Sequence, residues 1–172
     1  MKSKYLAGSY HYKDFETKGS TYRKHVIDLI KQVEYHLDTG STILDVGCGE
    51  GLIMAKLKEK GYKVKGCDVD PIAVQLGVAN GHDIACGTIS LEHVDAVLLC
   101  DVLEHVDHFA DTIKKAIHSA HKLIVVAIPD RPDKHAIRSI GPEDIRQQFD
   151  GFDEIHFSTR HARHLFIFKV GE

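Results

Sequence analysis

A glycine-rich turn between two acidic residues carries the clearest chemical signal in this sequence. The segment Ile43–Gly51 reads Ile-Leu-Asp-Val-Gly-Cys-Gly-Glu-Gly, an apolar run followed by glycine at every second position. Glycine adopts positive φ and has no side chain, so a ligand can lie against the backbone of such a turn. Asp68 follows the first of these glycines by 21 residues, where a carboxylate can accept hydrogen bonds from both hydroxyls of a ribose. The spacing therefore predicts a site for a ligand that carries a ribose.

The elements around this turn follow an α/β pattern. From Gly40 onward, short apolar runs alternate with helical patterns, which is typical of βαβ units and a parallel sheet. The expected strands are residues 42–46, 62–67, 83–86, 94–100 and 123–128, and the expected helices are 52–60, 71–81, 109–121 and a short one from 141. Two further strands, 152–158 and 164–170, are joined by the polar turn 159–162. We expect a seven-stranded, mostly parallel sheet with helices on both faces and a C-terminal antiparallel β-hairpin.

We expect the first 39 residues to form an N-terminal arm and a helix, and residues 40–172 to form the ligand-binding core of a single structural domain. Val26, Leu29, Ile30, Val33 and Leu37 share one stripe, so residues 21–37 are expected to be an amphipathic helix. Residues 1–19 have no clear period and are expected to be irregular. Tyr10, His11 and Tyr12 lie in this arm and are candidates for a lid over the ligand.

Composition narrows the class of protein. The 172 residues suffice for one domain with a real core, and 43% hydrophobic with 27% charged residues is the balance of a soluble globular protein. No apolar run approaches the roughly 20 residues that span a bilayer, and the N-terminus has no apolar signal core. A net charge of −3 does not favour nucleic acid. The four cysteines lack CxxC spacing, so we expect reduced thiols in a cytoplasmic protein.

The glycine spacing separates two ligand classes. Dinucleotide sites usually read GxGxxG, whereas this turn reads GxGxG after Asp45. That pattern resembles the class I S-adenosylmethionine-dependent methyltransferases. Residues 64–71, Val-Lys-Gly-Cys-Asp-Val-Asp-Pro, resemble their second motif. Residues 94–105 resemble their fourth-strand motif, with the Leu-Glu-His ending typical of the group related to ubiquinone-biosynthesis methyltransferases.

The resemblance implies S-adenosylmethionine as cofactor and S-adenosylhomocysteine as product. Asp45 and the turn would hold the methionine end, Asp68 the ribose, and Val69 one face of the adenine. Thr88 stands where relatives usually carry an acid, so its hydroxyl or the Ile89 N–H would contact the adenine amino group. The implied cofactor-binding residues are Asp45, Gly47, Cys48, Gly49, Asp68, Val69, Thr88, Ile89, Cys100 and Asp101.

Methyl transfer is an in-line displacement at a sulfonium, governed mainly by positioning. A base is needed only if the acceptor, an oxygen, nitrogen or carbon nucleophile, must lose a proton. Candidate bases at the ends of the fourth and fifth strands are His105, Glu104, Asp101 and His135. The spacing Asp101-x-x-Glu104-His105 with His135 also resembles metal-dependent RNA 2′-O-methyltransferases, although metal-free relatives share the Leu-Glu-His pattern. We therefore assign no metal.

The acceptor is not identified by the sequence. No insertion is large enough for a separate substrate domain, so the arm, residues 129–141 and possibly a second subunit or partner must form the acceptor site. The basic residues Arg160, His161, Arg163 and His164 form either a solvated turn or a contact for an anionic substrate. Two alternatives to a methyltransferase remain: a non-catalytic cofactor-binding module that supports a partner enzyme, and a nicotinamide-dependent oxidoreductase.

Overall fold

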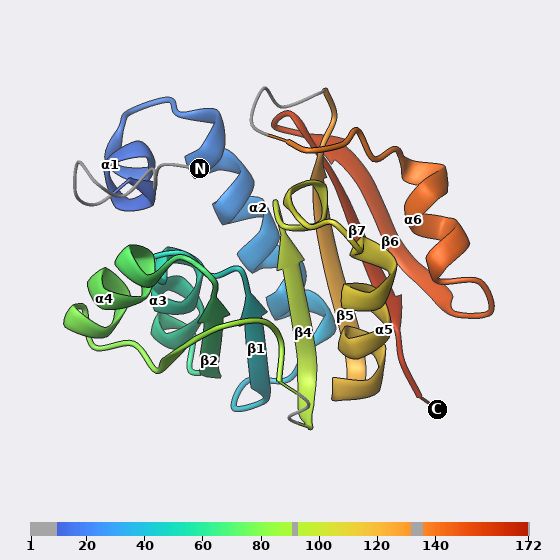
Figure 1. The fold of residues 1–172 in the computed structure, drawn as a ribbon, viewed down its shortest axis with the longest axis horizontal. Coiled ribbons are helices and arrows are strands. Elements are labelled where there is room, and N and C mark those ends of the chain that lie inside the picture. Colours follow the sequence, from blue (N-terminus) through green and yellow to red (C-terminus); the bar gives the residue numbers. More distant parts are fainter. Residues whose placement is uncertain (1–9, 91–92, 132–135, 172) are drawn as a thin grey trace.

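The computed structural model describes residues 10–90, 93–131 and 136–171, which form one seven-stranded sheet flanked by helices (Figure 1). The strand order is β3-β2-β1-β4-β5-β7-β6; β1 to β5 are parallel to one another, and β7 is antiparallel to both β5 and β6. The strands are β1 Thr42–Val46, β2 Lys63–Asp68, β3 Ile84–Cys86, β4 Val94–Cys100, β5 Ala120–Pro129, β6 Asp153–Arg160 and β7 Arg163–Lys169. The predicted fold class is confirmed.

Helices cover both faces of the sheet and bury a hydrophobic core on each. One core joins apolar residues of α2 (Thr21–His36), α3 (Leu52–Glu59) and α4 (Pro71–Ala79) to the sheet. The other joins α5 (Phe109–Ser119) and α6 (Pro142–Gln148) to the opposite face. Neighbouring strand residues alternate between the cores, as Leu98 and Leu99 do, because successive side chains point to opposite faces. Strands buried on both faces must be apolar throughout, as β4 and β5 largely are.

Parallel pairing aligns the ends of the central strands. Val46 at the end of β1 pairs with Cys67 in β2 and with Leu99 in β4, and Leu99 pairs with Val126 in β5. The segments that follow β1, β2, β4 and β5 therefore emerge together. We call this region the carboxyl end of the sheet; it lies at the top of Figure 1. Open α/β sheets bind ligands at this end.

The C-terminal hairpin turns more tightly than its sequence suggests. β6 and β7 are joined by His161 and Ala162 alone, with φ of 52° and 61°, instead of the four residues expected. Two residues of positive φ match the twist of an antiparallel pair. The backbone N–H of Asp130 donates to the Ala162 carbonyl at 3.1 Å, which holds the turn against the end of β5. Arg163 is thereby placed at the carboxyl end of the sheet.

Two local expectations were wrong. Residues His11–Glu16 form the short helix α1, in a segment expected to be irregular. Helix α5 ends at Ser119, and β5 begins at once with Ala120, where the helix was expected to reach His121. Both differences come from contacts between residues far apart in the sequence. Ala120 pairs with Val94 of β4, and the first N–H groups of α1 are bound by the side chain of Glu50. Among the residues with described positions, no helix is long and apolar enough to cross a membrane.

Candidate cofactor site

The glycine turn connects β1 to α3 and is fastened to β2. The N–H groups of Gly47 and Cys48 both donate to the Cys67 carbonyl, at 2.7 and 3.1 Å. Gly47 has φ 67°, and a Cβ there would lie 2.5 Å from a methyl of Val102, so neither conformation nor space permits a side chain. Gly51, with φ 87°, is the N-cap of α3. The predicted strand–turn–helix unit is present.

Asp45 is a buried acid beside this turn. Its side chain lies at the end of β1 and is 1% exposed, and its Oδ2 has no hydrogen-bond partner in the described part of the chain. Burial, and secondarily the charge of Asp68, raises the pKa of Asp45 to about 8. A buried carboxylate without a partner is costly. A cationic ligand group placed here would satisfy the free oxygen and lower that pKa.

Asp68 joins the end of β2 to the glycine turn. Its Oδ2 accepts a hydrogen bond from the Gly49 N–H at 2.7 Å, and its Oδ1 accepts one from the Asp70 N–H at 2.8 Å. A carboxylate oxygen accepts more than one hydrogen bond, so both oxygens keep capacity for a ligand. Val69, immediately after, is 70% exposed and offers an apolar surface. The carboxylate of Asp68 and the apolar surface of Val69 together suit a ribose that carries an aromatic base.

The loop after β3 lies next to the end of β2. The Gly87 N–H donates to the Asp68 carbonyl at 2.9 Å. Thr88 is exposed, whereas Ile89 is buried in the core that includes α5 and α6. Thr88 is therefore the residue of this pair with a side chain available to a ligand.

The end of β4 brings several candidate residues together. Burial raises the pKa of the Cys100 thiol, and the charges of Asp45, Asp101 and Glu104 raise it further. Asp101 has φ 55° and accepts from Arg163 Nε at 2.7 and 3.0 Å. The basic turn of the hairpin is thus partly engaged by an internal ion pair.

The candidate bases occupy different environments. Glu104 and His105 lie in the short 3-10 helix η2 (Leu103–His105); the Glu104 side chain is buried, while His105 is exposed. His105 Nε2 lies 3.8 Å from Glu104 Oε1. His135 lies outside the described residues. Asp101 is bound by a guanidinium, and the described residues contain no group of three or more potential ligands arranged for a metal ion.

The four cysteines differ in burial. Cys48 and Cys67 are buried, Cys86 is exposed and Cys100 is half-buried, and all four are free thiols. Burial raises the pKa of the Cys48 thiol, and the nearby acids Asp45 and Asp68 raise it further. The Cys48 thiol therefore stays protonated and packs as a small apolar group.

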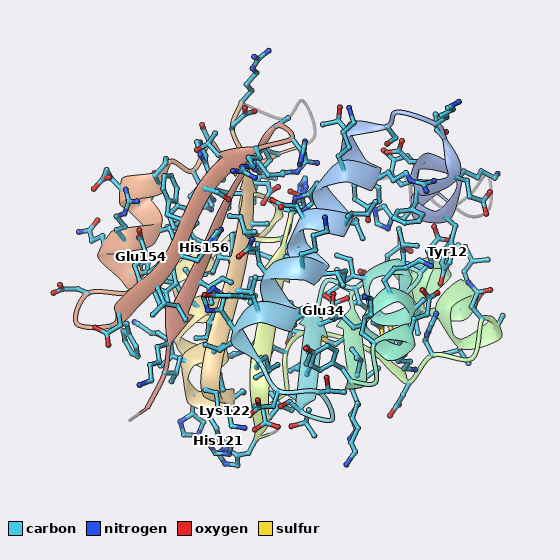
Figure 2. All side chains as sticks on the ribbon, turned by 180° about the vertical axis from the view of Figure 1, so that it is seen from behind. Tyr12, Glu34, His121, Lys122, Glu154 and His156 are labelled. Atoms are coloured by element: carbon cyan, nitrogen blue, oxygen red, sulfur yellow. The ribbon has the colours of Figure 1, made fainter. Side chains whose placement is uncertain are left out.

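Glu50 is a site residue that the sequence reasoning missed. Although it lies in the glycine turn, its side chain is fully buried, and Oε1 accepts from the N–H groups of Tyr10, His11 and Tyr12 at 2.8, 2.5 and 3.1 Å. It therefore caps the start of α1. The Tyr12 hydroxyl lies 3.1 Å from His82 Nε2, which makes a second contact between α1 and the rest of the chain; Tyr12 is labelled in Figure 2. In the sequence, the only indication of this role of Glu50 was an acidic residue between two glycines.

Comparisons with known proteins agree with this geometry. A family model described as a methyltransferase domain matches residues 19–166. A ubiquinone biosynthesis O-methyltransferase from Paraburkholderia xenovorans is 35% identical over 82 residues, 40% of this chain and 34% of the relative. A ribosomal protein L11 methyltransferase from Campylobacter concisus is 24% identical over 144 residues, 77% of this chain and 52% of the relative. These matches span about half or less of the relatives' own length.

Solved structures share the fold. Magnesium protoporphyrin IX methyltransferase from Synechocystis PCC 6803, solved with bound SAM, superposes with a TM-score of 0.76 at 19% identity, covering 97% of this chain and 88% of that one. The likeness extends over nearly all of this chain and supports the strand order described above. The family match covers most of the sequence, so the chain belongs to the methyltransferase domain family and has the fold of the class I S-adenosylmethionine-dependent methyltransferases.

Proposed function

We propose that this protein binds S-adenosylmethionine at the carboxyl end of the sheet and transfers its methyl group to an acceptor. The family match and the shared fold favour a methyltransferase over a nicotinamide-dependent oxidoreductase. The observation that carries the proposal is Asp45, a buried carboxylate with an unpartnered oxygen beside the glycine turn. The cofactor's amino group is a cation of the right kind to fill that position.

Different site residues would bind different parts of the cofactor. Asp45 and the turn from Gly47 to Gly49 would bind the methionine end, and Asp68 would accept the ribose hydroxyls while it holds the turn. Val69 and Thr88 would border the adenine. Cys100 and Asp101, at the end of β4, would close the pocket near the sulfonium, whose bound methyl group supplies the electrophile. The protein's task is then to orient the two reactants and to exclude water.

The acceptor would approach from the carboxyl end of the sheet. A shallow pocket opens there between η2 and the segment after β5, lined by Glu104, Pro129, Arg131, Ala136, Arg138, Ser139 and Ile140. This supports a contribution of residues 129–141 to the acceptor site. Glu104 is the candidate base within the pocket. His105 and His135 remain further candidates for the base.

Calorimetry with S-adenosylhomocysteine tests the cofactor site. Removing the ribose contacts in Asp68→Ala is expected to cost about 1.5–3 kcal/mol, at least tenfold in affinity, because each lost hydrogen bond has a charged partner. Asp45→Asn keeps the shape of the side chain but removes the charge, so it should weaken binding by a similar factor.

Asp83→Ala is the matched control, since Asp83 is an exposed acid immediately before β3. Its affinity should equal that of the parent. If the folded parent binds no S-adenosylhomocysteine, or if Asp45→Asn and Asp68→Ala bind as tightly as the parent, the proposed site is wrong.

A further inference from the structure

Arg138 is a half-buried arginine in the wall of the pocket between η2 and the segment after β5. Its Nη2 donates a hydrogen bond to the Asp107 carbonyl, and its guanidinium carbon lies 5.5 Å from the centre of the Phe109 ring. A guanidinium packs favourably on an aromatic face. The side chain is therefore held in place by uncharged groups, and its charge remains available to a ligand.

The backbone beside Arg138 is attached to the loop that follows β4. η2 begins two residues after Asp101, and the Ile137 N–H donates to the Glu104 carbonyl at 2.9 Å. Residues 136–141 consequently lie next to this loop at the carboxyl end of the sheet (Figure 1). The proposed cofactor site would place the sulfonium at the end of β4. A molecule bound in the pocket of Arg138 would thus lie on the side from which an acceptor reaches the methyl group.

The charge of Arg138 has no acidic partner among the residues that the structure describes. Arg163 pairs with Asp101, and Arg146 pairs with two glutamates, whereas Arg138 makes no such ion pair there. Its Nε is also buried without a hydrogen-bond acceptor in the described part of the chain. An unsatisfied buried donor is costly, and more so on a charged group. A ligand with an anionic oxygen would offset that cost.

The other residues of the pocket restrict the charge and the shape of such a ligand. Arg131 adds a second, exposed guanidinium, and Glu104 adds one carboxyl group. By formal charge these three groups give the lining +1, which balances one carboxylate better than a phosphate monoester, whose charge is about −1.5 to −2. Pro129, Ala136 and Ile140 supply apolar surface. The pocket therefore suits an apolar body that carries a single carboxylate.

We infer that the methyl acceptor carries a carboxylate group and that Arg138 binds this group. The inference rests on the proposed methyl transfer and adds the chemical class of the acceptor. A guanidinium can donate two parallel hydrogen bonds to a carboxylate, which fixes the orientation of the ligand as well as its position. Orientation is what an in-line transfer requires. An ammonium group would meet two guanidiniums, and a neutral group would leave the charge of Arg138 uncompensated.

The experiment uses the full chain saturated with S-adenosylhomocysteine, and benzoate as the carboxylate probe. In protein with 15N-labelled arginine, the Nε–H signal of Arg138 is assigned by its disappearance in Arg138→Gln. Benzoate should shift this signal saturably. Ligand-detected NMR titrations then compare the affinities of the variants for benzoate. Arg138→Gln should bind benzoate at least tenfold more weakly than the parent, because hydrogen bonds between two charged groups are lost.

Two further variants separate recognition of the carboxylate from charge alone and from folding. Arg138→Lys keeps the positive charge but loses the planar fork, so its affinity for benzoate should lie between those of the parent and Arg138→Gln. Arg23→Gln is the matched control. Arg23 lies 5.1 Å from the centre of the Phe15 ring and donates to the Phe15 carbonyl at 3.4 Å, which are the same two kinds of contact, but it does not line the pocket. Arg23→Gln should bind benzoate as tightly as the parent.

Three other probes test the charge of the ligand. Benzamide has the shape of benzoate without its charge, benzylamine carries a positive charge, and phenyl phosphate carries more than one negative charge. Benzamide and benzylamine should leave the Arg138 signal in place, and phenyl phosphate should bind more weakly than benzoate. Tighter binding of phenyl phosphate would assign the pocket to a phosphate and contradict the carboxylate. A saturable response to benzamide or benzylamine would contradict an anionic ligand.

The outcomes distinguish this inference from the proposed function. A parent that binds S-adenosylhomocysteine but not benzoate overturns the inference and leaves the proposed function standing. So does a fall in the melting temperature of Arg138→Gln with unchanged affinity for benzoate, because the contacts with Asp107 and Phe109 would then serve only the fold. Arg138→Gln should keep the parent's affinity for S-adenosylhomocysteine. A folded parent that does not bind S-adenosylhomocysteine overturns the proposed function, and the inference with it.

Discussion

A single buried carboxylate illustrates how the site depends on its environment. Asp45 is held by β1 in the interior, where solvation cannot stabilise its charge, and the charge of Asp68 adds to the effect. In the free protein its pKa is raised to about 8, so the carboxyl group is mostly protonated at neutral pH. A cationic ligand reverses this balance because it favours the ionised form. Binding of the cofactor is thereby linked to release of a proton.

This linkage predicts that cofactor binding releases close to one proton per site at about pH 7. Calorimetric titrations with S-adenosylhomocysteine in buffers of different ionisation enthalpy measure that number directly. Affinity should rise with pH between about 6 and 8, because less work is then needed to remove the proton. Asp45→Asn should abolish both effects, and an unchanged proton release in that variant would contradict the assignment.

At the scale of elements, α1 and the glycine turn stabilise each other. α1 has only six residues, and isolated helices of that length do not form in water. It persists because Glu50 accepts from three N–H groups at its start, where a negative charge is also favoured by the helix dipole. The same side chain lies inside the turn that would hold the cofactor. We therefore expect the arm and the cofactor loop to become ordered together.

Glu50→Ala should release α1 while the sheet stays folded. Hydrogen exchange at residues 11–16 should accelerate to nearly unprotected rates, and the affinity for S-adenosylhomocysteine should fall. Tyr12→Phe removes only the contact with His82 and serves as the milder control. Retained protection of α1 in Glu50→Ala would show that other contacts hold the arm.

At the scale of the whole molecule, α2 connects the N-terminal arm to the sheet. Its apolar stripe joins the core shared with α3 and α4, and this packing buries His25 at the carboxyl end of the sheet. The tight β6–β7 turn places Arg163 at the same end of the sheet, where its Nε donates a hydrogen bond to Asp101.

Burial of His25 predicts a contribution to acid sensitivity. Its folded pKa of about 4 lies below the usual 6.5, so from about pH 6.5 down to 4 the unfolded chain binds a proton that the folded chain does not. The free energy of unfolding should therefore fall as pH falls, by up to about 3 kcal/mol from this group. Urea titrations across this range should show a flatter dependence for His25→Phe, and identical slopes for variant and parent would contradict the prediction.

Local sequence pattern was enough to predict the parallel part of the sheet. The buried run in β4, the Gly-x-Gly-x-Gly turn and the acid closing β2 each reflect constraints that act within a few residues. Asp45 and Asp68 were predicted as site residues for the same reason. Cys100 and Asp101 were predicted from the resemblance of the β4 segment to the fourth-strand motif of the family, and the charges of Asp45 and Asp101 contribute to raising the pKa of the Cys100 thiol.

What the sequence by itself determined was the order of strands and helices, the methyltransferase family and the end of the sheet at which a cofactor would bind. Only the tertiary structure decided that Glu50 is buried under α1, that Arg163 is paired with Asp101, and that the nitrogen of His25 is left without a partner. His25 does share the stripe spacing of Leu29 and Val33, but that spacing does not reveal which groups lie opposite. These contacts join residues 38 to 62 positions apart or depend on burial by several elements, and periodicity along the chain carries no information about such distant pairs.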